Sequence, residues 1–506
     1  ANLDGLVAIA KAVTGAYLSS EGNAFSSRTA SQIVQENFNP GERDQPGGPL
    51  FGVQFSQLAC SDFSQRSPGG AATAGPMRSP LGLSADPGGL PLYKGGTVVG
   101  GLGVLADGIY GADVNIQDRD ADLDELIAVA GSFGFAAPPD RRAERITVDG
   151  KTLRYVDAEF PDLASDPASA PGLAGIDPAV GQLIEVPGYF AGGNALAGTA
   201  FGSAGSGIRP DAGGEFTPEL DAFVFVDSAN QPRFPPIAGT EAAGPDFAPL
   251  SASEVRTLLG SALGVANRAR AQIRRPLNSP ARVTIAVVDT RGTILGMVRG
   301  RDAPVFGADV SLQKARGAVA LSSSDVEQFL SGLPDAQYIR TIDTAPGLQP
   351  VRTIAFSDYV ADLNTFLAGS GFTGAGSTAF SDRGLGNLAR PFFPDGLNGQ
   401  PEGPLSKPAG EWSVFSTGLQ LDLSINAILN HVLFAVGAVA ADIATGCAGV
   451  AADGTQTLPG DTRLANGLQI FAGSVPIYRG NTLVGGIGVS GDGIDQDDMI
   501  AFLGLD

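Results

Sequence analysis

The chain carries one fourteen-residue segment twice, at residues 91–104 and 476–489. Nine of the fourteen positions are identical, and most of the others exchange related residues such as Leu and Ile or Lys and Arg. The two copies lie several hundred residues apart, which is much too far for a solenoid of short stacked repeats. The repeat therefore indicates a duplicated domain, and the function is to be sought in one module type that is used twice.

A second match locates the modules. The segment around Lys11 resembles the segment around Lys314, and each is followed by Leu-Ser-Ser. Because Cys60 and Cys447 precede their repeats by similar distances, the extra length of the second copy lies between Ser323 and Cys447. We therefore expect a truncated module one (1–130), a connector with short strands (131–250), and a module two (251–506) with an insertion between 324 and 446.

Charge and cysteine content exclude several classes of function. A net charge of −21 opposes binding to nucleic acid or to an anionic membrane. Two cysteines are too few for a disulfide framework, a zinc site or an iron–sulfur site. We expect Cys60 and Cys447 to share a packing role, with a single bridge across a pseudo-twofold axis as the alternative.

The chain begins with Ala and has neither a signal peptide nor an apolar run long enough to span a bilayer. We therefore expect a processed or incomplete chain. Scarce Lys and Cys, with abundant Gly, Ala, Ser and Asp, favour an extracytoplasmic bacterial protein, periplasmic or extracellular.

Module two shows the patterns of an antiparallel sheet with helices packed on it. Ser251 to Glu254 has the spacing of a capping box, apolar residues then recur at helical intervals, and β-branched runs flank a turn at Gly292. The pattern predicts a helix from 251 to about 275, strands over 282–288 and 293–299, and a helix over 310–321.

Each copy of the repeat is predicted to be a β-hairpin, because alternating apolar residues flank a glycine turn. Gly485, Gly486 and Gly488 remove side chains where a helix or ligand must approach the strand. An acidic helix start follows each copy. Module one has no counterpart to residues 251–299, so we expect its sheet to be completed by an N-terminal fragment or by another subunit's strand.

The connector is rich in Pro and Gly. Its strand candidates are residues 145–148, 152–156 and 222–226. We expect an ordered connector and not a third catalytic domain.

A series of residues in module two, followed by the hairpin and the acidic helix start, resembles the GlcG/HbpS-like haem-binding family. The series is Val288-Asp289, Gly292, Leu295, Arg299, Asp302-Ala303-Pro304, Ser311 and Lys314-Ala315. The resemblance covers residues 251–323 and 447–506, and residues 5–130 as a truncated copy. It implies an α+β fold in which two profilin- or PAS-like sandwich modules with antiparallel sheets pack as a pseudo-dimer, joined by the connector. It also implies haem binding and oligomerisation.

Haem would need an iron ligand. His431, the only histidine, lies on an apolar face of a predicted helix over 424–440, where a satisfied core histidine and an iron ligand both remain open. Tyr93 and Tyr478 occupy equivalent strand positions and are alternative ligands, or edge aromatics that cap the sheet. Arg299 and Lys314 are further residues that the resemblance implies could contact haem.

Two charged segments have a binding and a structural interpretation. Asp113 and Asn115 begin like a calcium loop, but Asp118 stands where that loop needs Gly, and helix capping is the alternative. The basic run of Arg268, Arg270, Arg274 and Arg275 could contact haem propionates or an acidic partner, or could form a solvated helix face.

The chain has no nucleophile elbow, phosphate loop, dinucleotide fingerprint or His-rich metal motif. The leading hypothesis is therefore an extracytoplasmic, non-catalytic haem-binding protein. The second is a structural or accessory subunit of a larger redox assembly that binds no haem, and the third is a haem-degrading enzyme. We expect the insertion to supply a haem ligand through His431 or a partner interface around Trp412.

Overall fold

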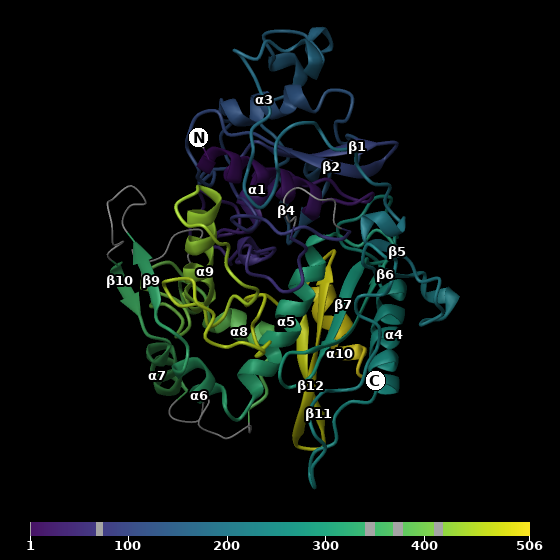
Figure 1. Cartoon of the computed structure of the whole chain (residues 1–506), viewed down its shortest axis with the longest axis vertical. Helices are drawn as coiled ribbons and strands as arrows, with labels where there is room; N and C mark the ends of the chain where they lie inside the picture. Colours follow the sequence, from purple (N-terminus) through teal and green to yellow (C-terminus); the bar gives the residue numbers. More distant parts are fainter. Residues whose placement is uncertain (1, 67–73, 340–349, 368–377, 409–417) are drawn as a thin grey trace.

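The structure, a computed structural model, describes residues 2–66, 74–339, 350–367, 378–408 and 418–506 (Figure 1). The described helices are α1 (Asn2–Leu18), α2 (Ser27–Ile33), α3 (Leu123–Gly131), α4 (Ala252–Arg268), α5 (Phe306–Ser322), α6 (Val326–Ser331), α7 (Phe356–Phe366), α8 (Asp382–Leu388), α9 (Leu419–Ala435) and α10 (Ile494–Leu503). The strands are β1 (Gly89–Lys94), β2 (Thr97–Gly103), β3 (Thr147–Val148), β4 (Lys151–Thr152), β5 (Ile208–Pro210), β6 (Ala222–Phe225), β7 (Val283–Val288), β8 (Ile294–Gly300), β9 (Ala336–Ile339), β10 (Pro350–Ile354), β11 (Ser474–Arg479) and β12 (Thr482–Gly491). The mixture of helices with antiparallel strands is the predicted α+β class.

The largest sheet has six antiparallel strands in the order β11-β12-β7-β8-β6-β5. β7 and β8 form the hairpin that was predicted from Gly292, which has a φ of 78° in the turn. β12 lies on the other side of β7, paired from Gly486 opposite Val288 to Gly491 opposite Val283. All of β7 and nearly all of β8 and β12 are buried, as expected for strands between two helical layers.

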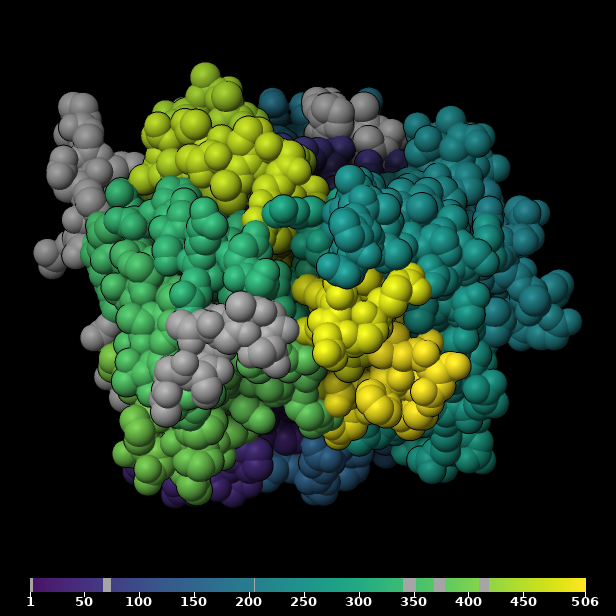
Figure 2. Space-filling view, turned by 90° about the horizontal axis from the view of Figure 1, so that it is seen from below, coloured from purple at the N-terminus to yellow at the C-terminus, as the bar shows by residue number. Residues whose placement is uncertain are grey.

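Helices cover both faces of this sheet. α5 packs on one face against β12, β7 and β11, with Leu312 and Val319 in the interface. α4 and α10 pack together on the other face, with Leu259 and Ile500 in the interface. Figure 2 shows the C-terminal segment in yellow, lying between the green and the teal parts of the chain. We call α5, the hairpin β11–β12 and α10 the C-terminal unit.

α1, the hairpin β1–β2 and α3 form a smaller assembly, which we call the N-terminal unit. α1 lies across the hairpin, at the top of the molecule in Figure 1. β1 and β2 pair only with each other, so no described strand lies on the outer edge of β2. The core continues into the rest of the molecule, because Leu18 and Tyr93 belong to the same buried cluster as Phe306 and Phe471.

The two copies of the repeat have the same backbone arrangement. Both are antiparallel hairpins in corresponding register, and both have one irregularity immediately before the tyrosine, Tyr93 or Tyr478. The prediction that each copy forms a hairpin is confirmed.

The connector and the insertion add structure around these units. β5 and β6 of the connector extend the large sheet at the edge of β8, while β3 and β4 form a separate small hairpin. The insertion packs around a buried cluster that includes Leu330, Leu363 and Leu419, and this cluster also contains Phe51 and Leu468 from outside the insertion. No described helix has both the length and the apolar character needed to cross a bilayer. Trp412 lies outside the described residues.

One predicted helix is too long. α4 ends at Arg268 and not near Arg275, because the chain turns back, with the Ala271 amide donating to Ser279 and the Ala281 amide donating to Ala269. Arg274, a candidate for a solvated helix face or a partner surface, is instead buried. Its guanidinium lies 2.6 Å from Asp302 and 2.5 Å from Asp492. The helix therefore ends at Arg268 although the helical periodicity of the sequence continues, because the chain beyond it gains these buried ion pairs.

Candidate functional site

α9 carries His431 into the interior, where the side chain is fully buried. Val432 and Ala435 of the same helix pack against Leu6 of α1 and Val186 of the connector. A buried imidazole requires a partner on each ring nitrogen that water can no longer reach.

Both ring nitrogens of His431 have such a partner. Nε2 lies 2.9 Å from the phenol oxygen of Tyr189, and Nδ1 lies 2.7 Å from Oδ1 of Asp442. The other oxygen of Asp442 accepts a hydrogen bond from Nη2 of Arg78 at 2.6 Å, and Nη1 of Arg66 lies 3.9 Å away. We call these five residues the His431 cluster.

The surroundings determine the protonation of this cluster. Burial lowers the pKa of His431, and Asp442 offsets only part of that effect, so the imidazole is neutral at pH 7. Burial alone would raise the pKa of Asp442. The hydrogen bonds and positive charges of His431 and Arg78 have the larger effect and lower this pKa to about 2. Burial raises the pKa of Tyr189. Because Asp442 is an anion it accepts from Nδ1–H, and the Tyr189 phenol therefore donates to the lone pair on Nε2.

The connector covers the imidazole. A turn closed by the bridge between Val186 and Phe190 brings Tyr189 over the ring. Gly188 in this turn has a φ of 82°, and a Cβ there would lie 2.9 Å from Nη2 of Arg78. The Arg78 guanidinium lies 5.4 Å from the centroid of the Tyr189 ring. Access to Nε2 therefore requires displacement of this turn.

The cluster has the form of a metal-ligating histidine with its supporting carboxylate. Such ligands donate one ring N–H to a carboxylate, which fixes the ring and leaves a basic lone pair on the other nitrogen. In this protein that lone pair is on Nε2 of His431. Tyr189 is a second group of a type that ligates ferric haem. Arg66 and Arg78 are cations of the type that pair with carboxylates.

The tyrosines of the repeat have different surroundings. Tyr93 is buried, its phenol lies 2.8 Å from the carbonyl oxygens of Ser20 and Asn23, and burial raises its pKa. Tyr478 is half-buried and lines an open groove of about 270 Å³ beside Leu258 of α4. No hydrogen bond among the described residues joins either tyrosine to His431.

Lys314 and Arg299 are committed to contacts inside the molecule. Lys314 is fully buried, with Nζ 2.9 Å from the carbonyl oxygen of Val489 and 3.1 Å from Oδ2 of Asp497. Arg299 is also buried and donates to the carbonyl of Ala303, and burial lowers its pKa to about 10. Neither has a hydrogen bond to the His431 cluster among the described residues.

The N-terminal unit repeats the lysine arrangement. Lys11 of α1 is fully buried, and its Nζ lies 2.7 Å from the carbonyl oxygen of Val104 and 2.5 Å from Oδ2 of Asp124. Asp86 also pairs with this ammonium. We call each arrangement a lysine lock, because it ties the helix across the hairpin to the end of the hairpin and to the helix that follows.

The candidate calcium residues surround an arginine. The carboxylate of Asp113 lies 2.8 Å from Nη1 of Arg28, which also lies 3.1 Å from Asp157 and 3.2 Å from Asp120. These three aspartates are a group with metal-like spacing among the described residues, and the Arg28 guanidinium already supplies positive charge there. The backbone amide of Asn115 donates a hydrogen bond to Oδ1 of Asp113 at 2.9 Å.

Helix capping, the alternative interpretation of the acidic segment, is present next to this group. The Asp122 side chain accepts a hydrogen bond from the Glu125 amide at 2.7 Å, at the start of α3. Asp118 accepts from the Asn115 side chain at 3.1 Å.

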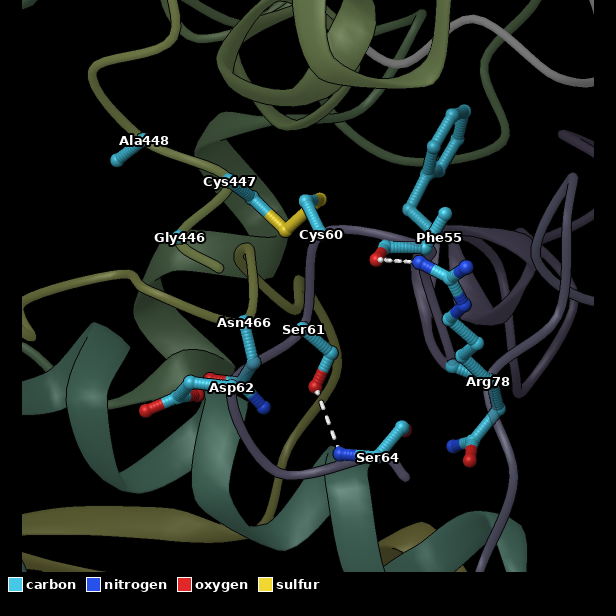
Figure 3. The surroundings of a disulfide bond; sticks show 12 residues. Phe55, Cys60, Ser61, Asp62, Ser64, Arg78, Gly446, Cys447, Ala448 and Asn466 are labelled. Atoms are coloured by element: carbon cyan, nitrogen blue, oxygen red, sulfur yellow. Dashed lines mark hydrogen bonds between the residues drawn. A yellow bond between two sulfur atoms is a disulfide. The ribbon is translucent and has the colours of Figure 1, made fainter. Parts of the chain in front are cut away.

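Cys60 and Cys447 form a disulfide, the bridged alternative for this pair (Figure 3). Beside it, Asp309 of α5 accepts from the Gln57 amide at 2.9 Å and from the Ser61 hydroxyl at 3.1 Å. Burial raises the pKa of Asp309 to about 6. The N-terminal segment is therefore joined to the C-terminal half by a covalent bond and by a buried polar network.

Sequence reasoning identified His431 but none of its partners. Tyr189 belongs to a connector with no periodic pattern, and Arg66, Arg78 and Asp442 lie in no motif. An acidic residue shortly after a buried histidine was the one available signal, and it is too common to identify a site.

Comparison with protein families finds a match in the C-terminal part of the chain. The family model described as "Haem degrading protein HbpS-like" matches residues 435–506. These residues contain Asp442, Cys447, both strands of the second repeat, and Asp497 of the lysine lock. No curated protein matches the chain.

Solved structures with some similarity include the PduOC–haem complex, which is 14% identical with a TM-score of 0.22, and covers 51% of this chain and 94% of its own. The protein ORFY of Klebsiella pneumoniae is 15% identical with a TM-score of 0.24, covering 53% and 96%. These scores are too low to support a structural argument. The predicted resemblance is confirmed over residues 435–506, which are similar to the HbpS-like family model.

Proposed function

We propose that the protein is an extracytoplasmic, non-catalytic haem-binding protein made of two HbpS-like modules that pack as a pseudo-dimer. The observation that carries the proposal is the His431 cluster, a neutral imidazole that Asp442 orients and whose Nε2 faces a phenol. The adjacent match to a haem-degrading family supports haem as the group that this imidazole binds. Two hairpins in the same register and two lysine locks support the two modules.

His431 is the proposed iron ligand through Nε2, and Tyr189 protects that nitrogen when haem is absent. A buried lone pair without a donor would cost about 1–3 kcal/mol, and the phenol removes this cost. When the turn of residues 186–190 moves away, Nε2 becomes free and Asp442 still holds the ring. Arg66 and Arg78, which lie 3.9 Å and 2.6 Å from Asp442, are the cations of the cluster that would pair with propionate groups. The haem, when bound, supplies the iron.

An oxidising compartment fits this chain. Disulfides form and persist mainly outside the reducing cytosol, and Cys60 is bonded to Cys447. The proposed location is therefore the periplasm or the extracellular space.

The proposal is tested by adding ferric haem to the purified full chain and recording its visible spectrum with pyridine-haem quantitation. We expect a shifted Soret band that His431→Ala removes without loss of folding. Tyr155→Phe changes a buried tyrosine outside the cluster and is the matched control, which should bind as the natural chain does. Tyr189→Phe should accelerate haem uptake. A Soret band that His431→Ala leaves unchanged would exclude His431 as the ligand.

A second candidate function is that of an accessory subunit that holds partner proteins without haem. The outer edge of β2, beside which the described residues place no strand, favours it. No spectral change on addition of haem to the natural chain would favour this function over the first. Loss of the haem spectrum with a reductant present would instead indicate a haem-degrading enzyme.

A further inference from the structure

The two units differ in what lies beside the hairpin. Beside the C-terminal unit, β7 and β8 extend the sheet beyond β12, and α4 lies against α10. In the N-terminal unit, the described residues place no further strand beside β2, and the short 3-10 helix Phe160–Asp162, instead of a long helix such as α4, lies against α3. An edge of unpaired backbone groups is a template for pairing with another chain.

Corresponding apolar residues have very different exposure in the two units. Val484 of β12 is 1% exposed, whereas Val99, at the same position of the repeat, is 55% exposed. Ile500 of α10 is fully buried, whereas Ile127 of α3 is 42% exposed. These isoleucines correspond because each stands three residues after the aspartate of its lysine lock. The N-terminal unit therefore exposes apolar surface that its counterpart buries.

Gly100 and its counterpart Gly485 differ in the space around them. Its counterpart Gly485 cannot accept a side chain, because a Cβ there would lie 2.4 Å from the carbonyl oxygen of Val288 on β7. A Cβ on Gly100 would have no atom within 4 Å, and Gly100 is not among the positive-φ glycines. Glycine inside a strand weakens it, and often marks close approach of another backbone. Gly100 therefore fits a neighbouring strand that is not among the described residues.

The helix-facing glycines of the repeat make the same contact in both units. A Cβ on Gly103 would lie 2.0 Å from the carbonyl oxygen of Ala8, and one on Gly488 would lie 2.0 Å from that of Ser311. Both units therefore use this glycine for the same contact with the helix across the hairpin. The contact that is missing in the N-terminal unit is the one on the outer edge.

There is open space beside the strand. A groove of about 600 Å³ is lined by residues Thr97 to Gly100 of β2, and also by Phe201, Ile208 and Val305. The groove places apolar side chains, together with polar ones such as Glu21 and Asp302, next to the outer edge of β2.

We infer that the N-terminal unit docks a polypeptide segment made of an amphipathic helix followed by an apolar β-hairpin, as residues 252–300 provide in the C-terminal unit. One strand of this segment pairs with the outer edge of β2, and its helix covers Ile127. A second copy of this chain is a poorer occupant, because a net charge of −21 opposes self-association. The inference deepens the accessory function, and it does not depend on haem binding at His431.

The test extends the full chain at its N-terminus with a second copy of residues 249–305, so that the added segment leads into α1 as the original leads into α5. Hydrogen exchange of the amides in residues 98–104 is measured by mass spectrometry in the extended chain and in the original chain. We expect exchange to slow by about tenfold or more in the extended chain. Gly100→Ala should abolish this protection, because its Cβ would meet the added strand.

The same Gly100→Ala change in the original chain is the matched control and should leave exchange and Tm unchanged, since the Cβ meets no atom. Gly485→Ala should lower Tm in both chains. The inference is overturned if the added segment gives no protection, or if Gly100→Ala keeps it. It is also overturned if exchange in the original chain slows with protein concentration, which would identify a second copy as the occupant. Haem binding is measured separately by the visible spectrum, so a failure of haem binding is distinguished from a failure of docking.

Discussion

The N-terminal and C-terminal units place a helix across the same hairpin and fix it with a buried lysine, yet their surroundings differ. Val99 and Val484 stand at one position of the repeat, and only Val484 is covered. The backbone pairing of the two hairpins is nevertheless the same. Local sequence is therefore enough to form the hairpin, whereas its burial depends on distant segments such as β7 and α4.

The lysine locks differ in their third contact. Lys11 pairs with two carboxylates, those of Asp86 and Asp124. Lys314 pairs with Asp497 and lies 4.7 Å from the centroid of the Phe471 ring, and Phe471 stands where the N-terminal unit has Asp86. One lock is therefore more polar than the other.

The largest effect is expected at the locks. Lys314→Met should lower the free energy of unfolding by about 3–5 kcal/mol, because Asp497 would remain as a buried carboxylate without its cation. Lys11→Met leaves two such carboxylates and should cost at least as much. Urea unfolding of the purified variants measures both. The double variant Lys314→Met with Asp497→Leu should recover most of the loss, and a double variant no more stable than Lys314→Met alone would contradict the electrostatic role.

Removal of the disulfide should have the next largest effect. Cys60→Ser together with Cys447→Ser should lower the free energy of unfolding by about 2–4 kcal/mol, because the unfolded chain gains freedom. The natural chain should show a similar loss when reductant is added, as followed by thermal unfolding. The double variant is the control and should not respond to reductant. An identical response in the two proteins would mean that the disulfide contributes nothing.

A pair of isoleucine variants compares the units directly. Ile500→Ala should cost about 2–4 kcal/mol, because it opens a cavity between α10 and α4. Ile127→Ala should cost less than about 0.5 kcal/mol, because this side chain is 42% exposed. Chemical denaturation of each variant checks both values. Equal losses would show that the exposed face of α3 is covered in solution.

The smallest effect is a dependence of stability on pH at Asp309, whose folded pKa is raised to about 6 by burial. Its unfolded pKa is about 3.9. Between these values the folded state binds more protons, so stability from this group is fully present below about pH 4 and is lost as pH rises through 6. Asp309→Asn should flatten the fall in Tm between pH 4 and 7. An unchanged slope would assign the dependence to other groups.

The stability that Asp442 contributes is expected to change with pH in the opposite direction. Its folded pKa of about 2 lies below the unfolded value, so its contribution is present above about pH 4 and is lost as pH falls toward 2. His431→Ala should reduce this acid sensitivity, because the hydrogen bond to His431 is a main cause of the lowered pKa.

The sequence alone determined the features that depend on near neighbours in the chain. The glycine turns and alternating apolar residues specify both hairpins, and the apolar spacing specifies α5 and the first turns of α4. The presence of His431 on a buried helix was likewise visible, because helical periodicity extends over only a few turns. These are contacts whose free energy is set by residues close in sequence.

The tertiary structure decided the features that depend on contacts between residues far apart in the chain. Tyr189 and His431 are 242 residues apart in the chain, and only folding brings the phenol to Nε2. α4 ends early because Arg274 gains buried ion pairs with Asp302 and Asp492, which no local pattern records. The outer edge of β2, which no described strand covers, has the same origin, since the sequence of β2 matches that of β12 and the two strands differ in which segments lie beside them.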